Sequence, residues 1–208
     1  MNPRIRLAAL ILPPWTIRRE LRRIDEATTC ALDLLLEERA PEALEAIRRE
    51  EGRRAGSVTA RREGMARAHD RRVAALLEAA GGEEGMLLAR RALFEAGASL
   101  GEEARRRLRL GRKDAELLLA ARVLYRVLGI RFRAEWDGPG AACVRIDRCA
   151  LARIYSPEAC LALSAADEGV VAGLRPGARL RFAERMTEGK RCCLARLELP
   201  QGDGEKGR

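Results

Sequence analysis

Aromatic residues are scarce in this chain. Phe, Trp and Tyr together make up 3% of its 208 residues, whereas hydrophobic residues of all kinds reach 47%. A core must therefore be built mainly from Leu, Ala, Val and Ile, and the apolar content argues against disorder throughout. Long apolar runs are also missing, since residues 7–12 stop at Pro13 and Pro14, well short of the roughly 20 residues that span a bilayer. We therefore expect a cytoplasmic protein without a membrane partner.

Histidine is nearly absent, with His69 as the single example. A Ser-His-Asp or Cys-His mechanism is therefore nearly excluded, unless His69 folds over the site. His69 stands beside Asp70 in a charged segment with helical periodicity, and we expect it to be exposed.

The charge balance is basic, with 40 Lys and Arg against 31 Asp and Glu and a formal charge of +9. Such a balance invites a nucleic-acid interpretation. However, most of the arginines lie beside acids, as in residues 18–20 and 48–50, and no basic stripe is interleaved with aromatics. We therefore favour a solvated arginine-rich surface over a nucleic-acid partner.

The hydrophobic periodicity changes along the chain from helical to alternating. Helical spacing predicts helices over residues 15–38, 41–51, 59–80, 83–97, 100–110 and 114–128. After Gly129, alternation predicts a hairpin, then a helix from Pro157 to about Leu174 and strands over 179–186 and 192–199.

The predicted fold class is therefore α+β, with N-terminal helices followed by helices packed on a mostly antiparallel four-stranded sheet, in the order helices-β-β-α-β-β. We divide the chain into a helical region (residues 1–80), an α+β ligand-binding or hydrolase-like domain (83–199) and a disordered tail (200–208).

Five of the six cysteines fall between Cys143 and Cys193. In a reducing compartment, such a concentration indicates metal, redox or nucleophilic chemistry rather than disulfides. Cys149 ends the second strand, Cys160 lies early in the next helix and Cys193 opens the last strand, so the three sulfurs can converge. Three thiolates and a carboxylate or water would satisfy tetrahedral Zn²⁺. The alternatives are buried core cysteines and thiol chemistry without a metal.

Three more residues complete the candidate site. Asp167 follows Cys160 by seven residues, close to the same helical face, where it is either a ligand or general base, or a solvent-facing acid. Glu184 shares the parity of the apolar residues in its strand, which places it in a pocket or at a sheet edge. In the last strand, alternation points Cys193 inward and leaves Cys192 at the surface or the pocket rim.

Residues 148–199 resemble the L-2-amino-thiazoline-4-carboxylic acid hydrolase family and are similar to 4-vinyl-reductase-type ligand-binding domains. The matching features are Cys149 at a strand end, Cys160 early in a helix, Asp167 farther along it, and a hairpin whose Gly189 and Cys193 match the family's glycine and final cysteine. Residues 92–101 and 114–130 resemble the helical lead-in of the same fold.

The resemblance implies a hydrolase in which water attacks the amidine-like carbon of a cyclic cysteine precursor and opens the ring. We therefore predict a hydrolase-like enzyme acting on a small polar molecule, with a C–N or C–S ring, at a cysteine-lined site. Asp167 and Cys160 are the predicted catalytic residues, and Glu184 and Cys192 the predicted ligand contacts.

The alternative function is a non-catalytic sensor module that binds a small molecule or zinc. In some sensor relatives, cysteines at the helix and the last hairpin hold zinc beside the ligand pocket. This resemblance implies Cys149, Cys160 and Cys193 as zinc ligands, and helices at the N-terminus that form a homodimer. The sequence has Met186 and Thr187 where further ligands are expected.

Overall fold

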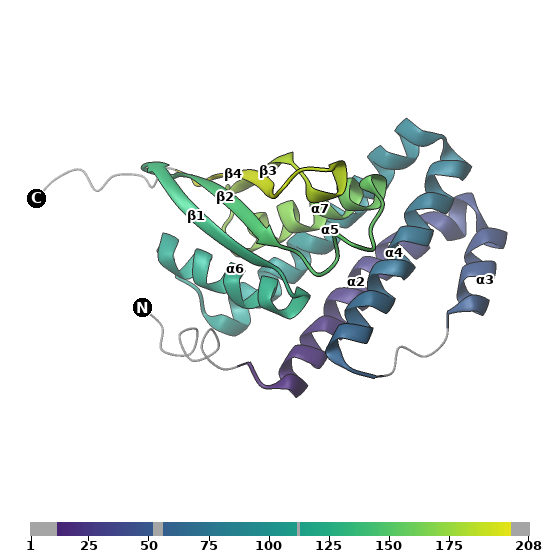
Figure 1. Cartoon of the computed structure of the whole chain (residues 1–208), viewed down its shortest axis with the longest axis horizontal. Coiled ribbons are helices and arrows are strands. Elements are labelled where there is room, and N and C mark those ends of the chain that lie inside the picture. The colour runs from purple at the N-terminus through teal and green to yellow at the C-terminus, as the bar shows by residue number, and fades with distance from the viewer. Residues whose placement is uncertain (1–11, 52–55, 112, 201–208) are drawn as a thin grey trace, which may run out of the picture.

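A computed structural model describes residues 12–51, 56–111 and 113–200. Five helices come first: α2 (Pro14–Arg39), α3 (Pro41–Glu50), α4 (Val58–Ala80), α5 (Gly82–Leu108) and α6 (Asp114–Leu128). They are followed by β1 (Arg131–Gly138), β2 (Ala141–Arg148), α7 (Pro157–Leu174), β3 (Arg179–Glu184), the short 3-10 turn η1 (Met186–Glu188) and β4 (Cys193–Glu198). The predicted α+β class and element order are confirmed (Figure 1). The predicted tail lies, beyond Pro200, outside the described residues.

The four strands form one antiparallel sheet in the order β1-β2-β4-β3. One face is apolar and packs against α6 and α7, which is the one-sided coverage that alternation predicts. Ile146 of β2 pairs with Cys193 of β4. This pairing brings the end of β2 and the start of β4, and with them two of the predicted site cysteines, to the same end of the sheet.

Helix α5 is continuous, so the prediction of two helices over 83–97 and 100–110 is wrong. Gly97 and Gly101 do not end a helix but allow contact with α7, whose Gly169 and Gly173 likewise lie against the backbone of α5. A Cβ atom on any of the four would lie 2.1 to 2.3 Å from a backbone oxygen of the other helix. Only glycine permits this approach, which fixes α7, and the site residues it carries, against α5.

The N-terminal helices share a core with the C-terminal half. Leucines of α2 and α3 and apolar residues of α4 pack with α5 and the first half of α7: Leu32, Leu36, Leu44, Val73, Leu76, Ala89, Leu93 and Ala162. Figure 1 shows α2 and α4 side by side, with α3 on their outer side. Within the described ranges, no helix is long and apolar enough to cross a membrane.

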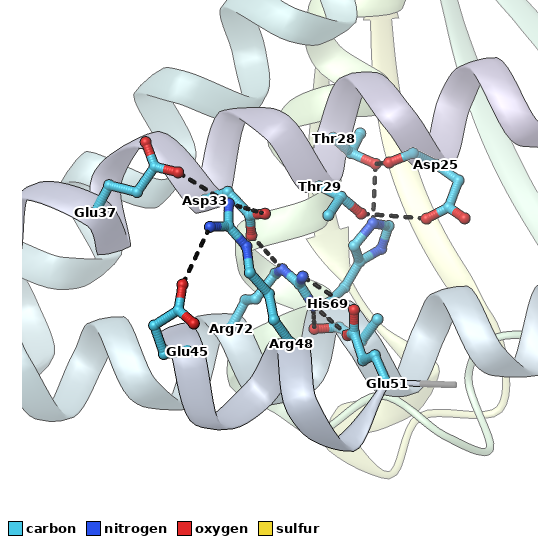
Figure 2. A network of polar contacts seen from close by, with 11 residues as sticks. Asp25, Thr28, Thr29, Asp33, Glu37, Glu45, Arg48, Glu51, His69 and Arg72 are labelled. Atoms are coloured by element: carbon cyan, nitrogen blue, oxygen red, sulfur yellow. Dashed lines mark hydrogen bonds and ion pairs between the residues drawn. The ribbon is translucent and has the colours of Figure 1, made fainter. Parts of the chain in front are cut away.

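A buried arginine ties α2, α3 and α4 together (Figure 2). Arg72 is 1% exposed. It donates hydrogen bonds to Asp33 (2.5 Å) on α2, to both carboxylate oxygens of Glu51 at the end of α3, and to the Ala68 carbonyl (3.2 Å). Burial opposes its charge, but the hydrogen bonds to Glu51 and Asp33 outweigh burial and raise the pKa of Arg72. The charge is thus fully engaged within the helical layer.

Candidate functional site

An apolar cavity lies between the sheet and the helices. Its volume is about 120 Å³, well above what a single water molecule needs. Residues of α2, α4, α5, α6, α7, β2, β3 and β4 line it, together with the segment between β2 and α7. Most of the wall is aliphatic, including Ile24, Leu100, Leu124, Ile146, Leu163 and Val170. Such a lining suits an apolar ligand held by a few polar groups.

Four predicted site residues meet at this cavity. Cys149 directly follows β2, Cys160 lies in the first turn of α7, Asp167 lies two turns farther along, and Cys193 begins β4; all four line the wall. Three different parts of the chain therefore contribute predicted site residues to one cavity wall. Two of the expected ligand contacts, Glu184 and Cys192, are not in the cavity wall.

The cysteine pair at the start of β4 differs from expectation in one respect. Cys192 is 8% exposed and Cys193 is 7% exposed, so the expectation of a more exposed Cys192 is wrong. Strand β4 begins at Cys193, and Cys192 therefore lies outside the alternation from which its position was inferred. The inward orientation of Cys193 is confirmed, because it belongs to the core beside Ala195 and Leu197.

The cavity cysteines are held as neutral thiols. Burial raises the pKa of Cys149 to about 11, against the opposing effect of backbone hydrogen bonds from Leu151 and Ala152. Burial also raises the pKa of Cys160 and of Cys193, although the positive charge of Arg185 lowers both. Since the thiolate is the nucleophile, these side chains act at neutral pH as apolar wall rather than as nucleophiles.

Asp167 is the acid of the cavity. Burial raises its pKa to about 7, while a hydrogen bond from the Tyr125 hydroxyl opposes the increase and the nearby Glu168 adds to it. The residue is partly exposed and lines the cavity. Near neutral pH, Asp167 therefore exists in both protonation states and can accept or donate a proton there.

Arg185 is a cavity residue that the sequence did not reveal. A β-bulge separates Phe182, which pairs with Ala195, from Glu184, which pairs with Leu194. Two residues of β3 thus lie opposite one residue of β4. Beyond this bulge, the inward and outward positions of β3 are exchanged. Of the two expected positions, Glu184 therefore takes the one at a sheet edge, since β3 is an edge strand, and Arg185, 8% exposed, lines the cavity instead.

The guanidinium of Arg185 is only partly engaged. Nη2 donates to Ser164 Oγ (3.2 Å) and Nη1 donates to Glu188 (3.3 Å), and the group lies over the Phe182 ring at 5.6 Å. Its Nε is buried without a hydrogen-bond partner in the part of the chain that the structure describes. A buried donor left unpaired is costly, so this N–H marks a place where a ligand atom would be stabilised.

His69 is buried, contrary to the prediction that it is exposed. It is 1% exposed, and its Nε2 and Nδ1 lie 2.9 Å from Thr28 Oγ1 and 3.0 Å from the Tyr155 hydroxyl (Figure 2 shows the first contact). The Thr28 hydroxyl donates to the Ile24 carbonyl (2.7 Å), so toward His69 it accepts, which requires a proton on Nε2. His69 therefore crosslinks α2, α4 and the cavity residue Tyr155.

The zinc site predicted from Cys149, Cys160 and Cys193 is not assembled by the geometry. Among the described residues, no group of three or more His, Cys, Asp or Glu side chains is arranged to hold a metal ion. We therefore derive no chemical step through a metal, and zinc binding stays a prediction.

No protein-family model matches the chain, and no curated protein matches it either. Among solved structures, the chain is similar to trafficking protein particle complex subunit 3 from Naegleria fowleri, whose crystal structure is described as covalently bound to palmitic acid. The TM-score is 0.52 and the sequence identity 15%, over 67% of this chain and 95% of that chain. At this identity the likeness shows the fold alone.

Proposed function

We propose that this protein binds a small, predominantly apolar molecule in the cavity between the sheet and the helices. The observation that carries the proposal is the cavity itself, because a well-packed interior leaves few voids larger than a water molecule. Its volume is about 120 Å³ and its wall is mostly aliphatic. The neutral thiols of Cys149, Cys160 and Cys193 extend that apolar wall.

The structural neighbour supports this function by analogy. That protein has the same fold and is described as covalently bound to palmitic acid, so this fold can accommodate a hydrocarbon chain. The proposal for the present chain requires only non-covalent binding, because its cavity thiols are protonated at neutral pH.

The fluorescent hydrocarbon diphenylhexatriene, which carries no polar group, tests the proposal. We expect its fluorescence to increase on binding to the wild-type protein. Val170→Phe, which fills part of the cavity, should weaken binding at least about tenfold, whereas Val170→Ala at the same position should retain it. Absence of binding to folded wild-type protein, or equal binding by both variants, would refute the function.

Hydrolysis is a second candidate function, and Asp167 is the observation that favours it. Its carboxylate lines the same cavity as Cys149, Cys160 and Cys193, and its pKa is about 7. In the ring-opening reaction, the carboxylate would take one proton from water as the water oxygen bonds to the amidine-like carbon, and would pass this proton to the ring nitrogen. As the ring C–N bond breaks, the new hydroxyl becomes a carbonyl, and its proton passes through Asp167 to the nitrogen, which leaves as a primary amine.

L-2-amino-thiazoline-4-carboxylic acid is the substrate with which to test hydrolysis. Its consumption, followed chromatographically, should require Asp167 and should be lost in Asp167→Asn. Glu158→Gln, an exposed change in the first turn of the same helix, should retain the rate. If Asp167→Asn retains the wild-type rate, the catalytic role of Asp167 is wrong.

Zinc binding by Cys149, Cys160 and Cys193 is tested separately by elemental analysis of protein purified without added metal. About one zinc ion per chain, lost in Cys160→Ser together with part of the stability, would establish the site, because metal binding and folding are coupled. A zinc content near zero would leave the three cysteines as cavity wall.

A further inference from the structure

We propose that Arg185 binds the carboxylate of a long-chain monocarboxylic acid whose hydrocarbon chain lies along the cavity. The proposal rests on the ligand-binding function proposed above and adds to it a ligand class and a residue that recognises it.

The first argument is the incomplete hydrogen bonding of Arg185. Its side chain is 9% exposed and lines the cavity, yet Nε has no partner within the described ranges. An unpaired N–H on a buried guanidinium in the wall of an apolar cavity is more readily explained by a missing acceptor than by packing.

The second argument is charge. The salt bridge of Arg185 is with Glu188 at 3.3 Å, and the Glu188 side chain is 38% exposed, so this pair is weakened by solvent. The other neighbour of the guanidinium, Ser164, is uncharged and accepts from Arg185 at 3.2 Å. A ligand carboxylate inside the cavity would be shielded from water. There a hydrogen bond between guanidinium and carboxylate is at its strongest.

The third argument is the shape of the cavity. Helices α5 and α7 run parallel, because Gly97 faces Ala166 while Gly101 faces Val170. By the same pairing, the cavity residue Ser164, two residues before Ala166, is level with about residue 95 of α5, whereas the cavity residue Arg107 lies about 12 residues farther along that helix. At 1.5 Å per residue, the two levels are about 18 Å apart. The lining is therefore elongated, which suits a chain rather than a compact ring.

The opposite end of the cavity is where it opens. Glu20, Arg23 and Arg107 line it there, and the side chains of Arg23 and Arg107 are 38% and 35% exposed. Ion pairs join Glu20 to both arginines, at 3.6 Å and 3.0 Å. A long-chain acid would therefore lie with its carboxylate at Arg185 and the end of its chain toward this opening.

Cis-parinaric acid, a fluorescent long-chain acid, and its methyl ester test the proposal directly on the wild-type protein. We expect the acid to bind at least about tenfold more tightly than the ester, the effect that one charge-assisted hydrogen bond supports. Arg185→Gln should abolish this preference. Arg185→Lys, which keeps the charge, should retain part of the preference. Arg181→Gln, on the exposed side of β3, should retain all of it.

The outcomes separate this inference from the proposed function. If diphenylhexatriene binds but the acid and its ester bind wild-type protein equally, Arg185 is a structural residue and the inference is overturned while the cavity function stands. If neither probe binds, the function itself fails. Competition shows whether the apolar part of the ligand is a chain or a compact ring. Displacement of parinaric acid by dodecanoate supports a chain, whereas displacement by naphthoate alone overturns the chain. If Arg185→Gln does not fold, Arg185→Lys decides: a preference as large as that of wild-type protein would place the carboxylate at another cavity arginine, Arg23 or Arg107, and overturn the inference.

Discussion

Two buried arginines, Arg72 and Arg185, show how differently this protein treats a charge. Arg72, between α2, α3 and α4, contacts two carboxylates and a backbone carbonyl. Arg185, beside the cavity, contacts the partly exposed carboxylate of Glu188 and the hydroxyl of Ser164. Its Nε has no hydrogen-bond partner among the described residues. A charge whose bonds are completed by the chain itself holds helices together, whereas a charge left incomplete at a cavity wall is available to a ligand.

The comparison predicts unequal costs when each charge is removed. Arg72→Met leaves Asp33 and Glu51 poorly paired within the helical layer, and we expect it to lower the free energy of unfolding by about 3 to 5 kcal/mol. Arg185→Met should cost no more than about 1 kcal/mol, because an incompletely paired charge contributes little net stability. Urea unfolding measures both. Arg71→Met, which removes an exposed ion pair with Glu50, is the control and should cost less than about 1 kcal/mol. Equal losses at Arg72 and Arg185 would break the comparison.

The cavity residue Asp167 offers a second test of how an incompletely paired charge affects stability, because its ionisation depends on pH. Its pKa is about 7 in the folded protein, against 3.8 for an ordinary aspartate. Between about pH 4 and pH 7 the unfolded chain loses this proton while the folded chain keeps it, so unfolding releases a proton and stability falls as pH rises. Above about pH 7 both states are ionised and the cost is constant, on the order of 2 to 4 kcal/mol.

Asp167→Asn should remove this part of the pH dependence and make the protein more stable than wild type at pH 8. The amide oxygen can still accept from the Tyr125 hydroxyl, so packing is little changed. Urea unfolding at several pH values between 4 and 8 measures the effect. Glu158→Gln removes an exposed carboxylate from the same helix and should retain the wild-type slope; a wild-type slope in Asp167→Asn as well would show that Asp167 is not the group responsible.

Local signals predicted most of the fold. Gly129 ends α6 in the left-handed conformation, and Pro157 begins α7, at the predicted positions, because such residues act within a turn of where they lie. Asp114 is the first residue of α6 but does not cap it, because the N-cap is Lys113 and no side chain caps the helix there. Gly97 and Gly101 misled the prediction of α5, since their role is contact with α7 rather than helix termination. That role depends on a residue partner far away in sequence.

The candidate site was predicted only in part for the same reason. Cys149, Cys160, Asp167 and Cys193 all line one cavity, and the three cysteines could be singled out because each lies near the start or end of an element with a clear pattern. Arg185 was not predicted as a cavity residue because a bulge after Phe182 exchanges the inward and outward positions of the strand. Alternation in the sequence cannot show where a bulge occurs. The burial of His69 escaped because two elements, α2 and the segment before α7, close over it.

His69, like Arg72, has its hydrogen bonds completed by the chain itself. Removing one of these bonds should have a smaller effect on stability than removing the charge of Arg72. Tyr155→Phe removes the hydroxyl 3.0 Å from His69 Nδ1 and should lower the free energy of unfolding by about 1 kcal/mol, the net value of a hydrogen bond. Thr28→Ser, which keeps a hydroxyl near Nε2, is the conservative control in the same cluster and should cost less. Thermal unfolding of the two variants decides, and a neutral Tyr155→Phe would mean that this contact is dispensable.

Ser164 gives the smallest and sharpest test, because it alters how far Arg185 is engaged without removing its charge. The Ser164 hydroxyl accepts from Arg185 Nη2 at 3.2 Å and donates to the Leu161 carbonyl at 2.7 Å. In Ser164→Ala the Leu161 carbonyl keeps its hydrogen bond from Arg90 (2.6 Å), so we expect a loss of stability below about 1 kcal/mol.

In the same variant, Arg185 has two N–H groups, on Nε and Nη2, free on one edge of the guanidinium. A carboxylate can accept from both at once, so parinaric acid should bind about threefold or more tightly than to wild type, while its methyl ester should gain little. Weaker binding of the acid would show that Ser164 holds Arg185 in the orientation that the carboxylate requires, and that its engagement assists binding rather than competing with it.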